Sequence, residues 1–424
     1  MLFFRGGKFS TVKKMAHPTT TKLEDAKSLI LKYASQVTKD VETIPIMQAH
    51  GRIVSEDIFS EINLPTQDNA AVDGFAVFSE QMAKSSFTAV IVVMARAGHP
   101  FEGEVKFGQA IRIYTGAVVP KGPDVVIMHE DCIDKGDQVI FKKKLKPGTN
   151  IRSCGENLAK GECVVQKGQK ITPSDMGQIA AAGFSKVNVF RLLKVVIYST
   201  GDEVMEMGTK IKGGQIHDSN RPILSGLLSS ENVDIIDGGI IPDNEQKLID
   251  AYNEGLKKAD VIISSGGASD GIEDHTQKAL SAIGAKNLFW RLAMKPGRPM
   301  SVAQKNEKIF FCLPGNPVAA FVCFKLLIAP VMDALSGRKP REPMTFRIKA
   351  GFQHKKQPGR TEYLRAVIQI DNAGHQHILL HGRKGAGVIS SLTGAHGLVE
   401  IPFESKGVEL GDILNFIPFQ EQVL

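Results

Sequence analysis

The sequence predicts a multidomain α/β plus β protein: a central doubly wound α/β domain, an inserted β module before it and a C-terminal β barrel after it. Length is the first indication, because 424 residues exceed one ordinary core and correspond to roughly three domains. The second is the run 191–340, where continuous apolar strands alternate with amphipathic helices, as in a parallel sheet covered on both faces. The third is that short strand-like runs broken by Gly, Pro and Asp fill the segments 61–162 and 341–424.

The N-terminal part is predicted to be a discontinuous mixed α/β domain made of residues 17–60 and 163–190. The segment "TKLEDAKSLILKYASQV" places Leu23, Ala26 and Ile30 on one helical face, and a capped helix is expected at 172–182. Residues 1–16 form an extension with Arg and Lys but without the apolar stretch of a secretory signal. A transit peptide and a start codon placed ahead of Met15 explain this extension equally well.

Composition and cysteine usage narrow the class of protein. Hydrophobic residues make up 42% of the chain and charged residues 23%. No stretch approaches the ~18 uninterrupted apolar residues of a membrane helix, so we expect no membrane span. The five cysteines are scattered and never spaced as CxxC, so the sequence indicates neither a disulfide framework nor a zinc site. We therefore expect the protein to lie in the reducing cytoplasm. The net charge of +7 is spread along the chain, so we expect small anionic substrates and neither nucleic acid nor a membrane as partner.

Glycine-rich loops follow two strands of the predicted sheet. In "SSGGASDG", Ser265, Gly266, Gly267 and Ser269 follow the apolar run "ADVIIS", and in "CLPGNPVAAF" a glycine turn precedes a helix with a free N-terminus. Adjacent glycines allow consecutive backbone N–H groups to converge on an anion, and a helix N-terminus adds partial positive charge. The loops therefore predict a phosphate or pyrophosphate site, although a strand-to-helix turn alone also requires glycine.

Acidic side chains stand beside these loops. The candidates are Asp202, Glu203, Asp243, Asp270, Glu273 and Asp274. A carboxylate beside a polyphosphate usually indicates an Mg²⁺ ion held by both. A plain Gly-Asp turn explains Asp202 and Glu203 as well, and a helix N-cap explains Asp243.

Cations come next along the chain. Lys295 and Arg298 flank a Pro-Gly turn in "RLAMKPGRPMS", where the chain leaves a strand. Cations on a rigid turn suit an oxyanion, and arginine offers a bidentate fork, although exposed turn lysines are also common. Because no spaced Ser, Cys and His set accompanies these residues, chemistry by metal and positioning is favoured over a nucleophilic triad.

Together the motifs resemble one family, the molybdopterin molybdenumtransferases, which include the bacterial MoeA proteins and the E domain of gephyrin. The resemblance runs from about residue 21 to the C-terminus. The segments that carry it are "DNAAVDGFAV", "IYTGAVVPKGPDVVI", "NIRSCGENL", "YSTGDEV", "IHDSN", "SSGGASDGIED", "AMKPGRP" and "LPGNPVAA". They occur in the order in which the family has them.

The resemblance implies an elongated homodimer that uses Mg²⁺ to join adenylylated molybdopterin with molybdate, releasing AMP. Catalytic roles are implied for Asp73, Thr115, Glu203, Asp243 and Asp274, of which Glu203, Asp243 and Asp274 would hold the metal. Substrate binding is implied for Ser265, Gly266, Gly267, Ser269, Lys295, Pro296, Gly297, Arg298, Pro314, Gly315, Asn316 and Arg360. It further implies that Asp73 and Thr115 act across the dimer, with transient contacts to the molybdopterin adenylyltransferase and to recipient molybdoenzymes.

The chain departs from the family pattern at two positions. Asn157 stands where the family commonly has the aspartate of GED, and Ala386 stands where it has the serine of QGSG, beside an added Lys384. These departures support an alternative, a non-catalytic pterin-binding or scaffold protein of the same fold. Another nucleotide hydrolase with the same α/β module is a third reading, which the "VDGFAV" and C-terminal segments oppose.

Overall fold

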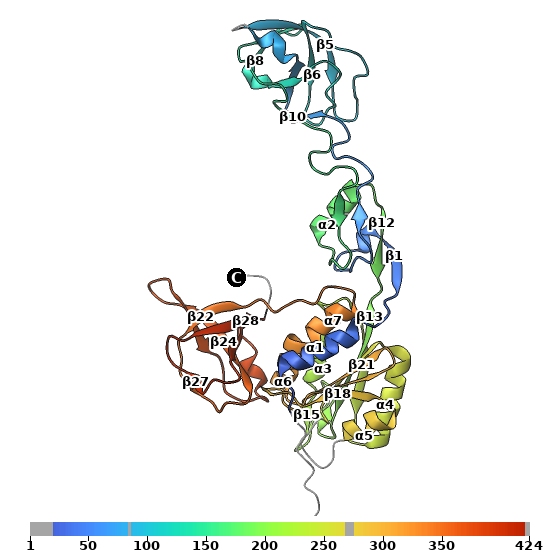
Figure 1. Cartoon of the computed structure of the whole chain (residues 1–424), viewed down its shortest axis with the longest axis vertical. Coiled ribbons are helices and arrows are strands. Elements are labelled where there is room, and N and C mark those ends of the chain that lie inside the picture. The colour runs from blue at the N-terminus through green and yellow to red at the C-terminus, as the bar shows by residue number, and fades with distance from the viewer. Residues whose placement is uncertain (1–19, 84–85, 268–274, 420–424) are drawn as a thin grey trace, which may run out of the picture. The chain divides into compact units, whose positions relative to one another are not determined.

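The computed structural model describes residues 20–83, 86–267 and 275–419. The chain divides into two compact units, the first formed by Met1–Asp40 with Arg191–Leu424 and the second by Val41–Phe190 (Figure 1).

The first unit is built on a six-stranded sheet. Its order is β16 (Val233–Ile241), β13 (Leu193–Thr200), β17 (Val261–Ser265), β21 (Lys308–Leu313), β20 (Ser301–Lys305) and β18 (Lys286–Trp290). The first four strands are parallel, so the predicted α/β domain is confirmed. The last two differ from the expected parallel course because β20 turns back into β21 through a tight hairpin, where Asn306 adopts a positive φ of 53°.

Helices cover both faces of this sheet (Figure 1). Helices α4 (Glu245–Lys258) and α5 (His275–Ala282) share a core with Val196, Ile262 and Phe310. Helices α1 (Leu23–Ala34), α3 (Asn220–Leu228), α6 (Pro317–Cys323) and α7 (Ala329–Leu335) lie against the other face. Both faces are apolar because successive strand residues point to opposite sides, which explains the unbroken apolar runs in the sequence.

One helical segment is relevant to the expectation about membrane helices. Pro317–Leu335, which includes α6 and α7, is long and apolar enough to cross a membrane by length and composition, although Lys325 and Asp333 interrupt its apolar residues. However, 83% of it is buried inside the protein. Its apolar character is therefore accounted for by packing against the sheet.

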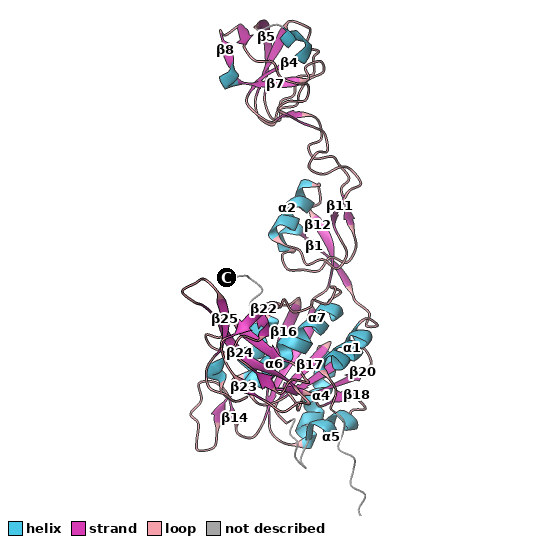
Figure 2. Ribbon diagram, turned by 60° about the vertical axis from the view of Figure 1, so that its left-hand side comes forward, coloured by secondary structure: helices cyan, strands magenta, loops and turns pink. Residues whose placement is uncertain are grey.

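The C-terminal part of the first unit is a closed barrel, as predicted (Figure 2). Its strands follow the order β24 (Thr361–Ile370), β25 (Gln376–Leu380), β22 (Phe346–Ala350), β28 (Ile413–Pro418) and β26 (Gly397–Ile401), and β26 pairs back onto β24. A short strand from the α/β segment, β19 (Met294–Lys295), pairs with the start of β24. This pairing joins the two parts of the unit next to the predicted cations.

The second unit contains a separate six-stranded sheet. Its order is β7 (Val125–Met128), β4 (Gly74–Val77), β6 (Gln109–Ile113), β5 (Phe87–Ala95), β9 (Gln138–Phe141) and β8 (Cys132–Asp134). Outside this stretch of the chain, β1 (Val41–Pro45) pairs with β12 (Lys186–Phe190), and β2 (Ile58–Phe59) pairs with β11 (Cys163–Val165). Helix α2 (Pro173–Ala181) begins at the expected cap, Thr172, which forms a capping box with Asp175. The residue limits that we expected for the separate domains stay predictions.

Helix α1 lies in a different place from the one expected. The sequence analysis grouped it with residues 163–190, but it belongs to the first unit. Its buried residues Leu23, Ala26 and Ile30 share the core of the α/β sheet with Leu292 and Phe311. An amphipathic helix shows from sequence alone that it has an apolar face, but not which surface that face will contact.

Candidate active site

The glycine loop after β17 packs tightly against the end of β13. Gly266 has a φ of +103°, and a Cβ atom there would lie 2.3 Å from the carbonyl oxygen of Thr200. The N–H of Gly266 donates to the carbonyl of Leu313 at the end of β21 (3.2 Å). Only glycine fits this approach, so the backbones of three parallel strands converge at one edge of the sheet.

A buried amide holds two of these strand ends together. The Nδ2 group of Asn220, at the start of α3, donates to Ser265 Oγ (2.6 Å) and to the carbonyl of Gly315 (2.7 Å). Ser265 Oγ in turn donates to the carbonyl of Pro314 (3.2 Å). The structure thus brings the predicted residues Ser265, Pro314 and Gly315 together. Asn220 was not predicted; its only signal was its place in the "IHDSN" segment.

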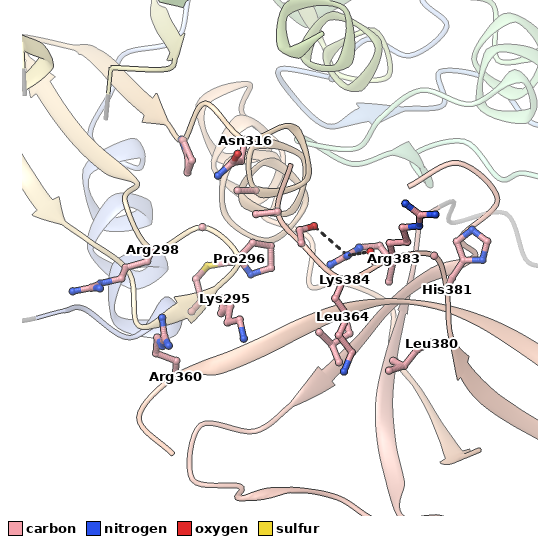
Figure 3. Close-up of a pocket in the computed structure, with 18 of the residues that line it drawn as sticks. Lys295, Pro296, Arg298, Asn316, Arg360, Leu364, Leu380, His381, Arg383 and Lys384 are labelled. Atoms are coloured by element: carbon pink, nitrogen blue, oxygen red, sulfur yellow. Dashed lines mark hydrogen bonds between the residues drawn. The ribbon is translucent and has the colours of Figure 1, made fainter. Parts of the chain in front are cut away.

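A cavity of about 260 Å³ lies beside these loops, between the 294–299 turn and the barrel (Figure 3). The predicted substrate-binding residues that line it are Lys295, Pro296, Gly297, Arg298, Pro314, Asn316 and Arg360. Gly297 has a φ of +109°, and a Cβ atom there would lie 2.6 Å from Cys323 Sγ, so the turn requires glycine. Lys295 and Arg298, which flank this tight turn, both line the cavity.

The cavity is cationic. Figure 3 shows Lys295, Arg298 and Arg360 on one side of it and Arg383 with Lys384 on the loop opposite. None of the described residues that line it is an aspartate or a glutamate. Cations around a recess suit an oxyanion, because a cationic side chain can donate charge-assisted hydrogen bonds to it.

The barrel contributes residues that sequence reasoning missed, namely His354, Arg365, His381 and Arg383. Burial lowers the pKa of Arg365 from its ordinary value. Its Nε donates to Ser391 Oγ (2.9 Å), and its Nη2 donates to the carbonyls of Arg383 (3.1 Å) and Gly385 (3.3 Å). Arg365 therefore holds the loop that carries Arg383 and Lys384 over the cavity.

The helix N-terminus after Asn316 differs from the expectation that it is free. The N–H of Val318, in the first turn of α6, donates to the carbonyl of Ala386 (3.1 Å). Ala386 thus uses its backbone to fix the loop on the helix. The missing hydroxyl at this position leaves that contact intact.

The predicted acids lie at the ends of β13 and β16. The N–H of Asp243 donates to Asp202 Oδ1 (3.0 Å), which joins the two loops. The sequence left open that Asp243 is a helix N-cap. The N-cap of α4 is instead Asn244, whose side chain accepts from the N–H of Lys247. Among the described residues, no group of three His, Cys, Asp or Glu side chains is arranged to hold a metal ion. The predicted residues Ser269, Asp270, Glu273 and Asp274 lie outside the described residues.

The remaining predicted pair lies in the second unit. Thr115 donates both its N–H and its hydroxyl to Asp73 Oδ1, each at 2.7 Å. The backbone bond first, and then the hydroxyl, lowers the pKa of Asp73 from its ordinary value. The next residue must be glycine, because a Cβ atom at Gly74 would lie 1.8 Å from the carbonyl oxygen of Ile127. The structure therefore brings Asp73 and Thr115 together and exposes an ionised carboxylate.

Comparisons with known proteins cover nearly the whole described chain. Three family models match: the MoeA N-terminal region (domains I and II) at residues 21–183, the "probable molybdopterin binding domain" at 196–334, and the MoeA C-terminal region (domain IV) at 347–419. A molybdopterin molybdenumtransferase of Haemophilus influenzae is 36% identical over 94% of this chain and 98% of its own length. One from a Nostoc species is 30% identical over 91% and 90%.

A solved structure shows the same architecture. The crystal structure of a molybdopterin biosynthesis MoeA protein from Pyrococcus horikoshii superimposes with a TM-score of 0.81 at 28% identity. The match covers 95% of this chain and 100% of that one. The motifs, the fold and the relatives agree, and the chain therefore belongs to the molybdopterin molybdenumtransferase family.

Proposed function

We propose that this protein inserts molybdate into adenylylated molybdopterin and releases AMP, a late step of molybdenum cofactor biosynthesis. The observation that carries the proposal is the cationic cavity next to the converging strand ends. Family membership agrees with it, since the three family models match consecutive segments along the length of the chain. The reaction needs a place for an oxyanion beside a place for a nucleotide-linked pterin, and we assign the first to the cavity and the second to the neighbouring loops.

Different residues of the chain bind the two substrates. Lys295, Arg298 and Arg360 bind molybdate by charge-assisted hydrogen bonds. The loops at 265–267 and 314–316 receive the phosphate groups of the pterin substrate, with Gly315 and Asn316 exposed at the start of α6, where a helix N-terminus favours negative charge. Holding both reactants at fixed positions converts a bimolecular encounter into a step within one complex.

Mg²⁺ is proposed as the metal. Magnesium is usually held by one or two carboxylates together with substrate phosphates, so the exposed acids at the ends of β13 and β16 fit this mode of binding. Glu203 and Asp243 would hold the ion, together with Asp274 from the segment outside the described residues. When bound, the metal would supply charge neutralisation for the departing AMP phosphate.

The protein is further proposed to be a cytoplasmic homodimer. In it, Asp73 and Thr115 of one subunit would serve the site of the partner. Transient contacts with the molybdopterin adenylyltransferase and with recipient molybdoenzymes would deliver the substrate and accept the product. The ionised state of Asp73, fixed by Thr115, suits a residue that interacts with cations or donors of the substrate complex.

The test is AMP release by the purified full chain given adenylylated molybdopterin and Mg²⁺, with and without molybdate. We expect release to depend on molybdate, and Lys295→Met to raise the molybdate concentration needed for half-maximal release by about tenfold or more. Lys349→Met, an exposed lysine on barrel strand β22, is the matched control and should behave as wild type. Tight pterin binding without release in the wild type would contradict the proposal.

A further inference from the structure

One buried carboxylate lies next to the cationic residues that line the cavity. Glu362, on β24, has a side chain that is only 5% exposed. Its Oε1 accepts from Lys295 Nζ at 3.2 Å, and its Oε2 lies 2.9 Å from His354 Nε2. The contact is built into the backbone, because Lys295 of β19 and Glu362 of β24 are register partners in the parallel pairing that joins the α/β segment to the barrel.

Glu362 is a counter-charge and not a ligand of the cavity. It is absent from the described lining residues, whereas Lys295 and His354 are among them. Burial alone would raise the pKa of Glu362, but the hydrogen bonds of His354 and Lys295 hold it below its ordinary value. The carboxylate is therefore ionised at neutral pH. It faces Lys295 and His354 directly, and Lys356 also lies nearby.

The pairing leaves Lys295 available to a ligand. Its side chain remains 53% exposed, although its ammonium group contacts Glu362. An oxyanion bound to that ammonium would lie within about two hydrogen-bond lengths of the buried carboxylate, close enough for substantial repulsion at low effective dielectric. The same carboxylate thus orients the cation and weakens its hold on an anion.

We propose that Glu362 limits how tightly the cavity holds its oxyanion, so that the anion can move on to its acceptor. The inference rests on the proposed function of the cavity. An oxyanion that is a substrate gains nothing from very tight ground-state binding, because stabilising the bound substrate alone raises the barrier that follows. Glu362 is in this sense a tuning residue that acts through Lys295.

The experiment measures molybdate binding to the full chain by calorimetry, with molybdate as the only ligand. Glu362→Gln removes the charge but keeps the volume and an oxygen that accepts from Lys295. We expect Kd for molybdate to fall by about tenfold at low salt, and the gain to shrink as salt is added. In the AMP-release assay, kcat at saturating molybdate should fall. A merely structural role would instead lower the melting temperature and weaken binding.

Glu400→Gln is the matched control. Glu400 is a barrel carboxylate that accepts from Asn415 Nδ2 (3.1 Å) and does not line the cavity, so its removal changes net charge equally without the expected tightening. If Glu362→Gln does not fold, Glu362→Met combined with His354→Leu leaves neither member of the buried pair unsatisfied. Because His354 lines the cavity, this double variant is compared with His354→Leu alone, and its Kd for molybdate should be the lower of the two.

Two outcomes distinguish a failure of the inference about Glu362 from a failure of the proposed function. If Lys295→Met weakens molybdate binding but the charge-removing variants bind molybdate no more tightly than wild type, the inference about Glu362 is overturned and the proposed function stands. If Lys295→Met leaves both molybdate binding and AMP release unchanged, the assignment of the cavity itself is wrong.

Discussion

At the scale of single residues, Thr115 fixes the charge of Asp73 with two hydrogen bonds to one oxygen. The folded pKa of Asp73 is lowered, so the stabilising effect of this contact is present above the unfolded pKa and is lost as the pH falls through the folded one. Thr115→Val removes the hydroxyl bond and keeps the N–H bond. We expect the pKa of Asp73 to rise and the acid limb of AMP release to move to higher pH.

The measurement is the pH dependence of AMP release, together with an NMR titration of the Asp73 carboxyl group. Thr43→Val is a matched control in the same unit, because Thr43 donates to Asn188 and not to Asp73. An unchanged acid limb in Thr115→Val, with the NMR titration of Asp73 shifted, would show that the reaction does not use the ionised form of Asp73.

At the scale of elements, Asn220 of α3 joins the ends of β17 and β21. The amide is buried, and its loss leaves the carbonyl of Gly315 without this donor. For Asn220→Ala we expect unfolding to become easier by about 1–3 kcal/mol, and KM for adenylylated molybdopterin to rise because the two loops lose their common anchor. Urea unfolding and AMP-release kinetics measure the two effects.

Asn220→Asp sharpens this test, since a carboxylate has nearly the same shape but cannot donate to the Gly315 carbonyl. It should resemble Asn220→Ala. Asn415→Ala removes an exposed amide on the barrel surface and should stay within about 0.5 kcal/mol of wild type. A KM equal to wild type in both Asn220 variants would argue against the anchoring role.

The elements also show how much of the fold and of the site could be predicted from the sequence. Alternating apolar strands and amphipathic helices predicted the α/β sheet, and the glycines of "SSGG" predicted the tight loop, because both leave local signals. The pairing of β19 with β24 involves only two residues of each strand and connects segments far apart in the chain. No periodicity in the sequence could therefore predict it. His354, Arg365 and Arg383 were missed for this reason, since their place at the cavity depends on how the barrel packs.

At the scale of the whole molecule, the predicted catalytic residues divide between the two units: Asp73 and Thr115 in the second, Glu203 and Asp243 in the first. The same division made the position of α1 hard to predict, because its apolar face could have matched either unit. Nothing in the sequence of one chain distinguishes a site completed within a subunit from one completed by a partner. An experiment on mixed dimers can make that distinction.

The experiment joins two variants that carry different affinity tags, Asp73→Asn and Lys295→Met. It is run at a low molybdate concentration, at which Lys295→Met releases almost no AMP and Asp73→Asn is expected to be inactive. A twofold symmetric dimer with shared sites would place both substitutions in one site and leave the other intact. The purified mixed dimer should therefore release AMP at about half the wild-type rate per dimer, while both homodimers stay inactive. If each site is completed within its own subunit, every site in the mixed dimer carries one substitution, and the mixed dimer will be as inactive as the homodimers.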